Sequence, residues 1–444
     1  MRQYPPRALA ALLTAFSLLG CSGGGGGAVP PPPTPTPPPG QQKIQHVIII
    51  FQENRTVDNL FHGLPGADTA SSGTNSKGAT VSLVPVSISA PYDIDHSHHA
   101  FTTEYNSGSM NGWDLVGMNC PSKTCNPLTA FGYVPQTEVQ EYFTMAETYT
   151  FADRMFQTNQ GPSLPAHQYI ISGTSTNAVG SNLLAAENPN YANGNSRNCD
   201  GDPLSRVAMI DPSGSEATKL LPCFEHATLM DELDAKGVSW RYYDSFNGGL
   251  WSAPDAISHI RNGADWNNVI IPQTTILNDI AAGQLRQVSW VIPNGKQSDH
   301  ALSTDGTGPA WVASIVNAVG NSAYWNNTAI FITWDDWGGW FDHVTPQIFN
   351  SYELGFRVPL IVVSPYAKPG YVSHVQHEYG SILKFTEETF GTASIGYTDA
   401  RADDLSDCFN YNQTPIVFKT IASNRRASYF LAQPMSNVPP DTDF

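Results

Sequence analysis

The sequence has few charged side chains, and positive ones are the scarcer kind. Asp, Glu, Lys and Arg make up 14% of the 444 residues, and 22 Lys and Arg stand against 39 Asp and Glu, which gives a formal net charge of −17. A chain this acidic is not expected to bind nucleic acid, or to dock on an anionic membrane through a basic patch. If the substrate is an anion, its site must supply positive charge locally.

An apolar run of transmembrane length is also missing near the N-terminus. Residues 8–20 (ALAALLTAFSLLG) are too few for a standard membrane span. They follow two arginines, end directly before Cys21 and predict a lipoprotein signal peptide over residues 1–20. The run into Cys21 resembles the lipobox of bacterial lipoproteins, in which this cysteine is acylated. We expect an exported protein held in the membrane by a lipid on Cys21, at the outer membrane, facing the periplasm or on the cell surface. The alternative is an ordinary secretory signal with a stray cysteine.

Cysteine is scarce, with six residues in all. If Cys21 is acylated, five remain, and four of them form two pairs that are close in sequence. An exported protein meets an oxidising compartment, so we predict the disulfides Cys120–Cys125 and Cys199–Cys223, with Cys408 left over. A zinc site is the alternative, but the spacings do not match paired C-x-x-C motifs.

Glycine and proline are concentrated in one segment. Residues 21–41 consist largely of a Gly run and a Pro run, a flexible and then an extended stretch. We interpret them as a linker that holds a folded body away from a membrane. Residues 42–444 are then the folded domain, which is long enough for a large hydrophobic core.

Five apolar runs of strand length are present in this body. They are unbroken rather than alternating, as in strands covered on both faces of a parallel sheet. The five runs are residues 46–51, 238–243, 287–292, 328–334 and 358–363. Helical patterns lie between them, at residues 165–173, 228–237, 309–322 and 378–391. This alternation predicts an α/β fold, with a doubly wound, mostly parallel central sheet flanked by helices.

Acidic and amide residues follow two of these runs directly. Glu53 and Asn54 come after the first, and Asp335 and Asp336 come after the fourth. Ligands of open parallel sheets bind beyond the carboxyl ends of the strands, where these side chains are expected to meet. Three carboxylates brought together there repel one another unless a cation lies between them, and a hard divalent metal prefers oxygen ligands. We predict a metal site; the alternative is that both pairs cap helices or form turns.

Ser163 lies in a loop that Gly161 and Pro162 impose, just before a predicted helix. Free amides and the helix dipole favour an anion such as phosphate at that position. A hydroxyl held there beside a metal is a candidate nucleophile. Taken alone, Ser163 is interpreted as a helix N-cap, the usual role of serine in that setting.

Histidines form the third set of candidates. A phosphate-transferring enzyme needs donors for the phosphoryl oxygens and an acid for the leaving group, and histidine serves both near neutral pH. The candidates are His96, His98, His99, His300 and His343. His300 and His343 each follow an aspartate, Asp299 and Asp342. Any single one of them is more often a structural hydrogen-bond donor, and the residues alone assign no role to His98, His99 or His343.

These segments resemble a bacterial phosphoesterase family that contains phospholipases C and acid phosphatases, together with plant non-specific phospholipases C. The matching stretches include HVIIIFQENRTVDNLFHG, GPSLPAHQYIISGTS, SDHALS and TAIFITWDDWGGWFDHV, in family order over roughly residues 45–391. The resemblance implies an alkaline-phosphatase-like core. It also implies one divalent metal (calcium, magnesium, zinc or manganese) and attack by Ser163 to give a phosphoserine. The implied ligands are Glu53, Asn54, Ser163, Asp335 and Asp336. The resemblance further implies that His300 gives a proton to the leaving oxygen and that His96 binds the phosphoryl group.

One departure from the family pattern lies beside the candidate nucleophile. Many relatives have Asn-Arg where this chain has Ala166-His167. That leaves the role of this position in phosphate contact or packing open.

The predicted function is hydrolysis of a phosphate ester, either a small phosphomonoester or a phospholipid head group. A second function, of a different class, is a non-catalytic, lipid-anchored surface binding protein with a structural divalent metal. It does not account for a hydroxyl and several histidines next to the acidic residues. A sulfatase is disfavoured because Leu-Pro-Ala-His follows Ser163 where sulfatases need a C-x-P-x-R type of motif.

Overall fold

A computed structural model describes residue 1 and residues 37–121 and 125–436. The predicted signal peptide, Cys21 and most of the predicted linker lie outside the described residues. Residues 33–444 form one compact unit, and the description below concerns that unit alone. No helix within the described ranges has the length and apolar character needed to cross a bilayer.

An eight-stranded sheet forms the centre of the unit. Its order is β14-β13-β15-β1-β16-β17-β8-β18. In that order the strands are β14 (Val269–Ile270), β13 (Trp240–Tyr243), β15 (Val288–Val291), β1 (His46–Gln52), β16 (Thr328–Trp334), β17 (Leu360–Val363), β8 (Thr150–Ala152) and β18 (Tyr371–Ser373). The five predicted apolar runs supply β1, β13, β15, β16 and β17, and the predicted α/β class with a mostly parallel sheet is confirmed.

One predicted strand runs against the others. β17 pairs antiparallel with β16 on one side and with β8 on the other, whereas every other pairing of the sheet is parallel. Residues 360–363 are all buried, as in the parallel strands. The apolar run therefore indicates that the strand is buried on both faces of the sheet. It does not indicate whether the strand is parallel or antiparallel, because the chain connections set that direction.

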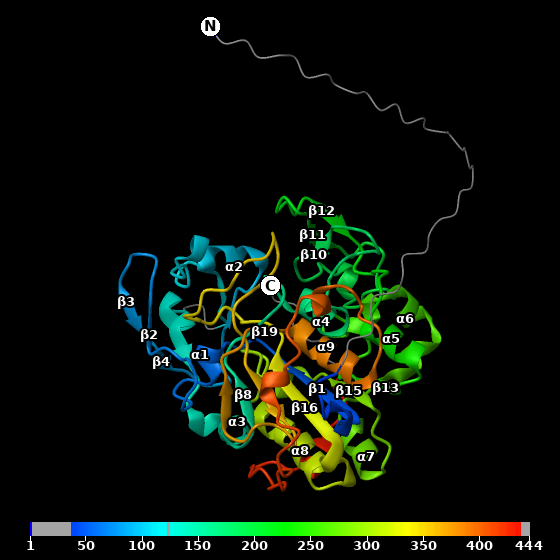
Figure 1. The fold of residues 1–444 in the computed structure, drawn as a ribbon. Helices are drawn as coiled ribbons and strands as arrows, with labels where there is room; N and C mark the ends of the chain where they lie inside the picture. The colour runs from blue at the N-terminus through cyan, green and yellow to red at the C-terminus, as the bar shows by residue number, and fades with distance from the viewer. Residues whose placement is uncertain (2–36, 122–124, 437–444) are drawn as a thin grey trace, which may run out of the picture. The chain divides into compact units, whose positions relative to one another are not determined.

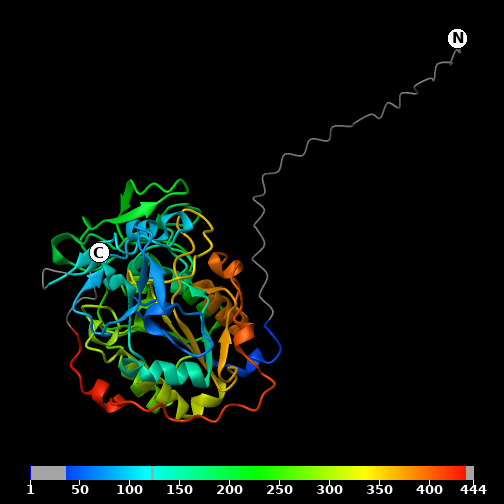
Figure 2. The same ribbon diagram turned by 90° about the vertical axis from the view of Figure 1, so that its left-hand side faces the viewer.

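Helices cover the two faces of the sheet (Figures 1 and 2). α3 (Gln140–Thr148), α7 (Thr275–Ala281) and α8 (Gly308–Gly320) pack together on one face, where α3 contacts β8 and β17 and α8 contacts β16. α4 (Ser163–Ser172), α5 (Leu229–Lys236) and α9 (Tyr379–Phe390) pack together on the other.

Local signals fix the ends of these helices. Thr228 caps α5 by accepting from the backbone of Asp231, and Gly237 ends it in a left-handed conformation with φ 72°. Gly391, with φ 64°, ends α9 in the same way. The helices predicted at 228–237, 309–322 and 378–391 are confirmed to within a few residues.

Shorter elements surround this core. The remaining helices are α1 (Val57–Leu60), α2 (His98–Tyr105), α6 (Ser258–Asn262) and α10 (Ala427–Leu431). Small sheets are formed by β10 (Leu184–Ala185), β11 (Val207–Ile210) and β12 (Thr218–Leu220); β2 (Ser72–Thr74) and β3 (Thr80–Ser82); β4 (Val84–Pro85) and β7 (Gly132–Tyr133); β5 (Asp93–Ile94) and β6 (Met118–Asn119); and β9 (Met155–Phe156) and β19 (His377–Glu378).

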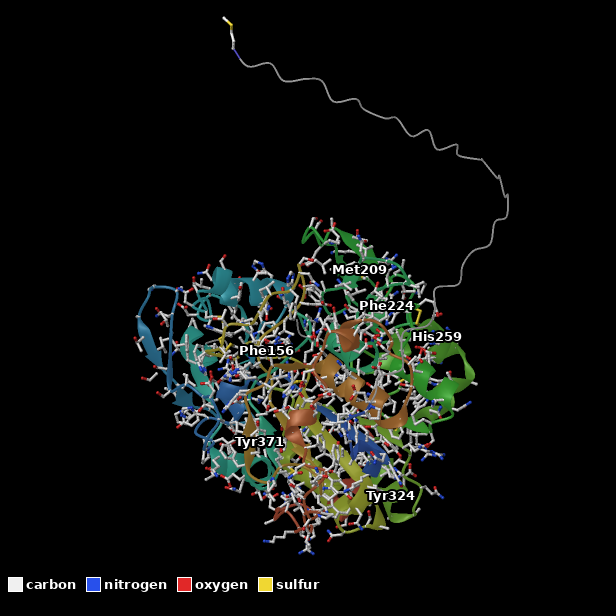
Figure 3. The ribbon with its side chains drawn as sticks, in the orientation of Figure 1. Phe156, Met209, Phe224, His259, Tyr324 and Tyr371 are labelled. Carbon is white, nitrogen blue, oxygen red and sulfur yellow. A yellow bond between two sulfur atoms is a disulfide. The ribbon has the colours of Figure 1, made fainter. Side chains whose placement is uncertain are left out.

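The hydrophobic core extends from the central sheet into the layer of β10–β12. Met209 of β11 and Phe224, both labelled in Figure 3, are fully buried members of it. The predicted disulfides Cys120–Cys125 and Cys199–Cys223 are both present, and Cys408 is a buried free thiol.

Candidate active site

The two acidic segments lie side by side at the carboxyl ends of β1 and β16. These strands are parallel neighbours, and Gln52 is paired with Trp334 at their last positions. Backbone hydrogen bonds continue past the strand ends, from Asp335 N to Gln52 O at 2.9 Å and from Arg55 N to Asp336 O at 2.9 Å. The sheet register therefore sets the segment 53–54 against the segment 335–336.

Asp335 orders the turn between these segments. Its Oδ1 accepts from the backbone amides of Asn54, at 2.8 Å, and Asp336, at 2.7 Å. Asn54 adopts a left-handed backbone conformation with φ 62°. Gly338 packs against it so closely that a Cβ there would lie 2.5 Å from Asn54 O, so this position needs a glycine.

Two oxygen atoms of this turn stay available to a ligand. Asp335 Oδ2 and Asn54 Oδ1 are buried and accept no hydrogen bond from the described residues. A buried polar atom without a partner costs free energy, so such atoms in a native site point to a bound group.

His167 of α4 lies against the same carboxylates. Its Nε2 is 3.1 Å from Glu53 Oε1 and 3.9 Å from Asp335 Oδ2, and one donor atom from each of the three side chains falls within 4.8 Å of the others. Burial lowers the pKa of His167 to about 4, so the ring is uncharged at neutral pH. A neutral ring cannot balance two buried carboxylates, whereas a divalent cation can.

Asp336 supports the same conclusion. Burial, and then the neighbouring Asp335, raise the pKa of Asp336 well above its usual range. A pair of adjacent buried carboxylates ionises fully only when a cation compensates the charge. The donor set of carboxylates, an amide oxygen and an imidazole thus fits a divalent metal ion.

Ser163 faces this cluster from the first residue of α4. Pro162 precedes the helix, and the Ser163 hydroxyl donates to Asp336 Oδ2 at 3.4 Å. The sequence places Ser163 just before the helix, with an N-cap as its alternative role. In the structure Pro162 is the N-cap and Ser163 is the first residue of the helix, and the Ser163 hydroxyl is directed at the Asp336 carboxylate.

The loop before Ser163 is fixed by amide side chains. Gln157 Nε2 and Asn159 Nδ2 both donate to Gly161 O, at 3.2 and 2.8 Å. Gln157 Oε1 also accepts from Trp337 N at 3.0 Å, which ties this loop to the one that carries Asp336. The nucleophile candidate and the acidic turn are therefore held as one unit.

His96 and His300 lie beside each other at this site, with ring centroids 5.9 Å apart. His96 Nδ1 lies 2.7 Å from Ile94 O and its Nε2 lies 3.1 Å from Asn54 Nδ2. His300 Nδ1 lies 2.6 Å from Ala301 O. When Nδ1 of each ring donates to its carbonyl, Nε2 is left as the nitrogen that acts on other groups.

Asp299 precedes His300 in sequence, but its carboxylate binds other residues. Asp299 Oδ2 instead accepts from Tyr142 Oη, at 2.7 Å, and from Trp334 Nε1, at 3.1 Å. Asp299 has φ 73°, and this backbone turn sends its side chain toward the sheet. Asp299 therefore holds the loop that carries His300 in place.

Arg55 fixes the same loop from the other side. Its Nε and Nη2 both donate to Asp299 O, at 2.9 and 2.6 Å, and Nη2 also donates to Ile88 O at 2.7 Å. The guanidinium is fully buried. The arginine after Glu53 and Asn54 therefore positions the backbone that carries His300.

The other histidines have partners outside this cluster. His343 Nδ1 and Nε2 lie 2.7 and 3.1 Å from carboxylate oxygens of Asp58 and Asp68, so the pair it forms is not with Asp342. Asp342 is instead bound by Arg357. His98 Nδ1 lies 2.5 Å from Glu216 Oε1, and His99 is exposed.

His167 is the member of this cluster that the sequence interpretation left without a role. It lies four residues after Ser163, so one helical turn places both side chains on the same face of α4. That spacing is the signal that would have found it. Its partners, Glu53 and Asp335, follow strands that are distant from it in sequence, so spacing alone could not show what it contacts.

A serine directed at a buried acidic cluster, at the carboxyl edge of a mostly parallel sheet, agrees with the family to which the sequence can be assigned. The model of the Phosphoesterase family matches residues 44–393, most of the chain. The chain belongs to this family and is a hydrolase that acts on phosphoric ester bonds.

Among its relatives are several phospholipases C. It is 24% identical over 438 residues to phospholipase C B of Mycobacterium tuberculosis, which covers 84% of this chain and 78% of the relative. Identity to the non-hemolytic phospholipase C of Pseudomonas aeruginosa is 24%, over 83% of this chain and 57% of the relative. Identity to non-specific phospholipase C6 of Arabidopsis thaliana is 21%, over 84% and 74%.

Solved structures with a related arrangement have much lower identity. A protein in the alkaline phosphatase superfamily from Vibrio parahaemolyticus covers 83% of this chain and 72% of its own, with a TM-score of 0.37 at 12% identity. The lipoteichoic acid synthase LtaP from Listeria monocytogenes covers 82% and 77%, with a TM-score of 0.37 at 8% identity. The order and directions of the strands described above, rather than these scores, define the fold class of this chain.

Proposed function

We propose that the chain is a metal-dependent phosphoric ester hydrolase that acts through a covalent phosphoserine on Ser163. The observation that carries the proposal is the placement of the Ser163 hydroxyl, 3.4 Å from Asp336 Oδ2. It lies at the N-terminus of α4, against carboxylates from two neighbouring strands. A helix N-terminus favours the phosphoryl anion, and the carboxylates favour a cation.

Ser163 is the nucleophile in this scheme. Because its proton is directed at Asp336 Oδ2, lone pairs of Oγ remain for attack on phosphorus. The Oγ–P bond forms as the bond from phosphorus to the leaving oxygen breaks. Water then attacks the phosphoserine, the Oγ–P bond breaks, and phosphate or a phosphomonoester is released.

The proposed metal ligands are the residues that follow β1 and β16, together with the nucleophile. They are Glu53, Asn54, Ser163, Asp335 and Asp336, and His167 adds a donor beside Glu53 and Asp335. A bound divalent ion would lower the pKa of the serine hydroxyl and neutralise charge on the phosphoryl oxygens. The chemistry of the donors alone does not distinguish calcium, magnesium, zinc and manganese.

The two histidines handle the phosphoryl group and the protons. His300 donates a proton to the leaving oxygen and accepts one from water in the second step. His96 binds the phosphoryl oxygens as an imidazolium, because its Nε2, which lies 3.1 Å from Asn54 Nδ2, must carry a proton to donate to them. Loss of His300 should therefore harm esters with poor leaving groups more than nitrophenyl esters.

The substrate is a phosphate ester, either a small phosphomonoester or a phospholipid head group, and the names of the relatives make the second a natural candidate. We further propose that residues 42–444 are the catalytic domain and that the chain is exported and anchored by a lipid on Cys21. Membership in a family of hydrolases favours the enzyme over a non-catalytic binding protein with a structural metal.

A trapping experiment tests the covalent step. Wild type is mixed with a phosphomonoester, quenched with acid and digested, and phosphate should appear on the peptide that contains Ser163. Ser163→Ala should keep the fold and lose turnover by several orders of magnitude, while Ser163→Thr keeps a hydroxyl and retains some activity. A Ser163→Ala enzyme with near-native turnover would leave Ser163 a structural role only.

Two further assays complete the test. Turnover of a phosphomonoester and of phosphatidylcholine, measured side by side, identifies the substrate class. Exhaustive chelation should abolish both activities, and re-addition of a single divalent metal should restore them. Activity that survives chelation would remove the metal from the proposal while leaving the trapping result to stand on its own.

A further inference from the structure

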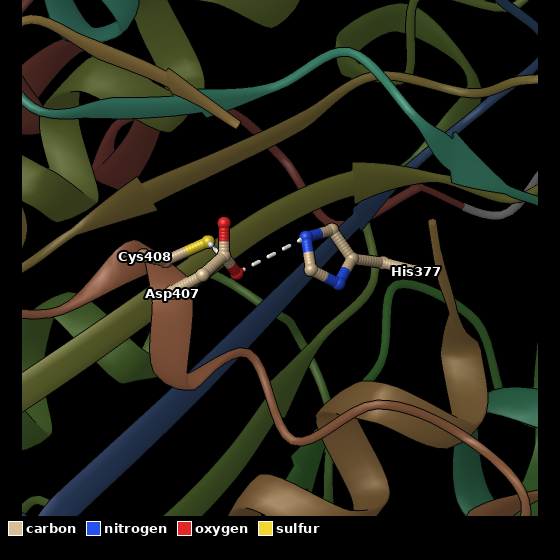
Figure 4. Close-up of side chains that lie close together, drawn as sticks. All are labelled: His377, Asp407 and Cys408. Atoms are coloured by element: carbon tan, nitrogen blue, oxygen red, sulfur yellow. Dashed lines mark hydrogen bonds and ion pairs between the residues drawn. The ribbon is translucent and has the colours of Figure 1, made fainter. Parts of the chain in front are cut away.

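A second cluster of metal-binding side chains lies at the edge of the central sheet near β18. It contains His377 of β19 and two consecutive residues, Asp407 and Cys408, of the 3-10 turn η11 (Ser406–Cys408). One donor atom from each lies within 4.8 Å of the other two. In the view of Figure 4, the carboxylate of Asp407 lies between the thiol of Cys408 and the imidazole of His377.

The burial of these groups suits a binding site. The side chain of His377 is fully buried, that of Asp407 is 22% exposed, and Cys408 is fully buried. Solvent therefore reaches the cluster on the Asp407 side only. The thiol and the imidazole are thus shielded from solvent, while the carboxylate is partly open to it.

Each ligand is oriented by a neighbour. His377 Nδ1 lies 2.6 Å from Asp403 Oδ1, so Nδ1 carries the proton and Nε2 is directed at the cluster, 3.5 Å from Asp407 Oδ1. Asp407 Oδ2 accepts from the hydroxyl of Ser373, which also lies 3.2 Å from His377 Nε2. A carboxylate behind the distal nitrogen of a histidine is the usual support of a zinc-bound imidazole.

The three donor atoms that are left for a metal lie close to one another. Asp407 Oδ1 lies 3.6 Å from Cys408 Sγ and 3.5 Å from His377 Nε2. Sulfur, nitrogen and oxygen in this combination select zinc or a similar borderline ion, whereas calcium and magnesium prefer oxygen alone.

We propose that His377 Nε2, Asp407 Oδ1 and Cys408 Sγ bind one zinc-class divalent ion, separate from the metal of the active site. On binding, the Cys408 thiol releases its proton, and the thiolate and the carboxylate together balance the two positive charges of the ion. Water on the side of Asp407 completes four-coordination. The active-site cluster has no cysteine among its residues, so a thiolate ligand distinguishes this ion from the other.

The ion would join segments that are remote in sequence. Cys408 O accepts from Lys368 N at 2.9 Å and from Thr150 Oγ1 of β8 at 3.0 Å, so η11 already lies against the sheet edge. Two residues beyond His377, the Tyr379 hydroxyl donates to Trp334 O at 2.8 Å and also to Asp335 O. The ion thus has a structural role: it would hold β19 against η11, and the segment that follows β19 contacts the backbone of the active site through Tyr379.

Without an ion, the same residues can form a different network. A protonated His377 would donate from Nδ1 to Asp403 and from Nε2 to Ser373 or Asp407, as a buried ion pair with a free thiol beside it. The two arrangements differ in whether Cys408 is a thiolate bound to metal, which is directly observable.

Cobalt substitution tests the proposal. The full-length protein is stripped with chelator and titrated with Co²⁺, and the near-ultraviolet charge-transfer band of a cobalt thiolate is measured. Wild type should develop the band, and zinc should displace it. Cys408→Ser should lose the band and bind one equivalent of metal fewer, while the exposed His99→Gln, the control, keeps both.

Two results would overturn the site: no thiolate band in wild type, or a band that persists in Cys408→Ser. Asp407→Asn provides a second variant if Cys408→Ser does not fold. It should retain the band with a cobalt affinity at least about 10-fold weaker, and an unchanged affinity would remove Asp407 as a ligand. Each readout is independent of phosphate-ester turnover, so the active-site proposal does not depend on the outcome.

Discussion

At the scale of single residues, His167 links the nucleophile helix to the acidic turn. Its Nε2 lies 3.1 Å from Glu53, and burial holds its pKa at about 4. We predict that His167→Gln weakens binding of the active-site metal by about 10-fold or more, because a neutral nitrogen donor beside two carboxylates is lost. Calorimetric titration with Mn²⁺ or Zn²⁺ measures the effect.

The matched control for His167 is His226→Gln. His226 is also buried, and it contacts Ser172 at the opposite end of the same helix. This control should lose stability without a change in metal affinity. If wild type and His167→Gln bind the metal with equal affinity, His167 is not a metal ligand and contributes only packing.

Arg55 is the second residue for which the structure predicts a distinct effect of substitution, because its guanidinium holds the loop that carries His300. A lysine cannot donate to Asp299 O and Ile88 O with the geometry of a guanidinium. We predict that Arg55→Lys lowers the free energy of unfolding by about 3 kcal/mol. It should also lower turnover more for esters with poor leaving groups, since His300 shifts with its loop.

Exposed Arg425→Lys is the control for Arg55, and it should match wild type in both stability and leaving-group dependence. Thermal unfolding and turnover of paired alkyl and nitrophenyl esters are the measurements. A uniform loss on both esters would mean that Arg55 supports the fold without positioning His300.

At the scale of elements, α5 and α6 are joined by His259 (labelled in Figure 3). Its Nδ1 lies 2.7 Å from Glu225 and its Nε2 lies 3.0 Å from Asp231, in the first turn of α5. The hydrogen bond to Asp231 raises the pKa of His259 to about 9. Because the folded-state pKa is raised, the stabilisation is complete below the unfolded pKa of about 6.5 and is lost as pH rises through about 9.

We therefore predict that wild type and His259→Gln differ most in melting temperature near pH 6, and that the difference disappears above about pH 9. Melting curves between pH 6 and 10 measure it, with the exposed His99→Gln as control. A difference that does not change with pH would show that His259 contributes packing only.

The elements also show what the sequence can predict. Unbroken apolar runs gave β1, β13, β15, β16 and β17, since each is buried on both faces. β8 and β18 escaped notice because three-residue strands leave no pattern. The antiparallel direction of β17 depends on chain connections that residue types do not encode.

Site residues divide in the same way. Glu53, Asn54, Asp335 and Asp336 were found because each pair follows a strand, and strand ends mark the ligand-binding edge. His167 was left without a role, and the adjacency of Asp299 and His300 did not show that Asp299 binds Tyr142 and Trp334. The contacts of His167 with Glu53 and of Asp299 with Tyr142 join segments more than 100 residues apart, through packing that local spacing does not show.

At the scale of the whole molecule, the two disulfides close loops of different length. The bonded residues are 24 apart for Cys199–Cys223 and 5 apart for Cys120–Cys125. Loop-closure entropy predicts a loss of about 3 kcal/mol when the first is removed as a double serine variant, and about 2 kcal/mol for the second. Urea unfolding under oxidising conditions measures both losses, and added reductant should bring wild type to the level of the variants. Variants that unfold at the wild-type midpoint would show that neither bond contributes.

The central position of β1 also governs when activity can first appear. β1 is the earliest strand of the sheet to be synthesised, yet its two neighbours are residues 288–291 and 328–334. Until about three-quarters of the chain has been made, Glu53 and Asn54 have no partner segment, and the apolar run before them is exposed to chaperones. A nascent chain that has not yet reached the end of β16 therefore has no assembled site, so hydrolysis cannot begin before that strand is made.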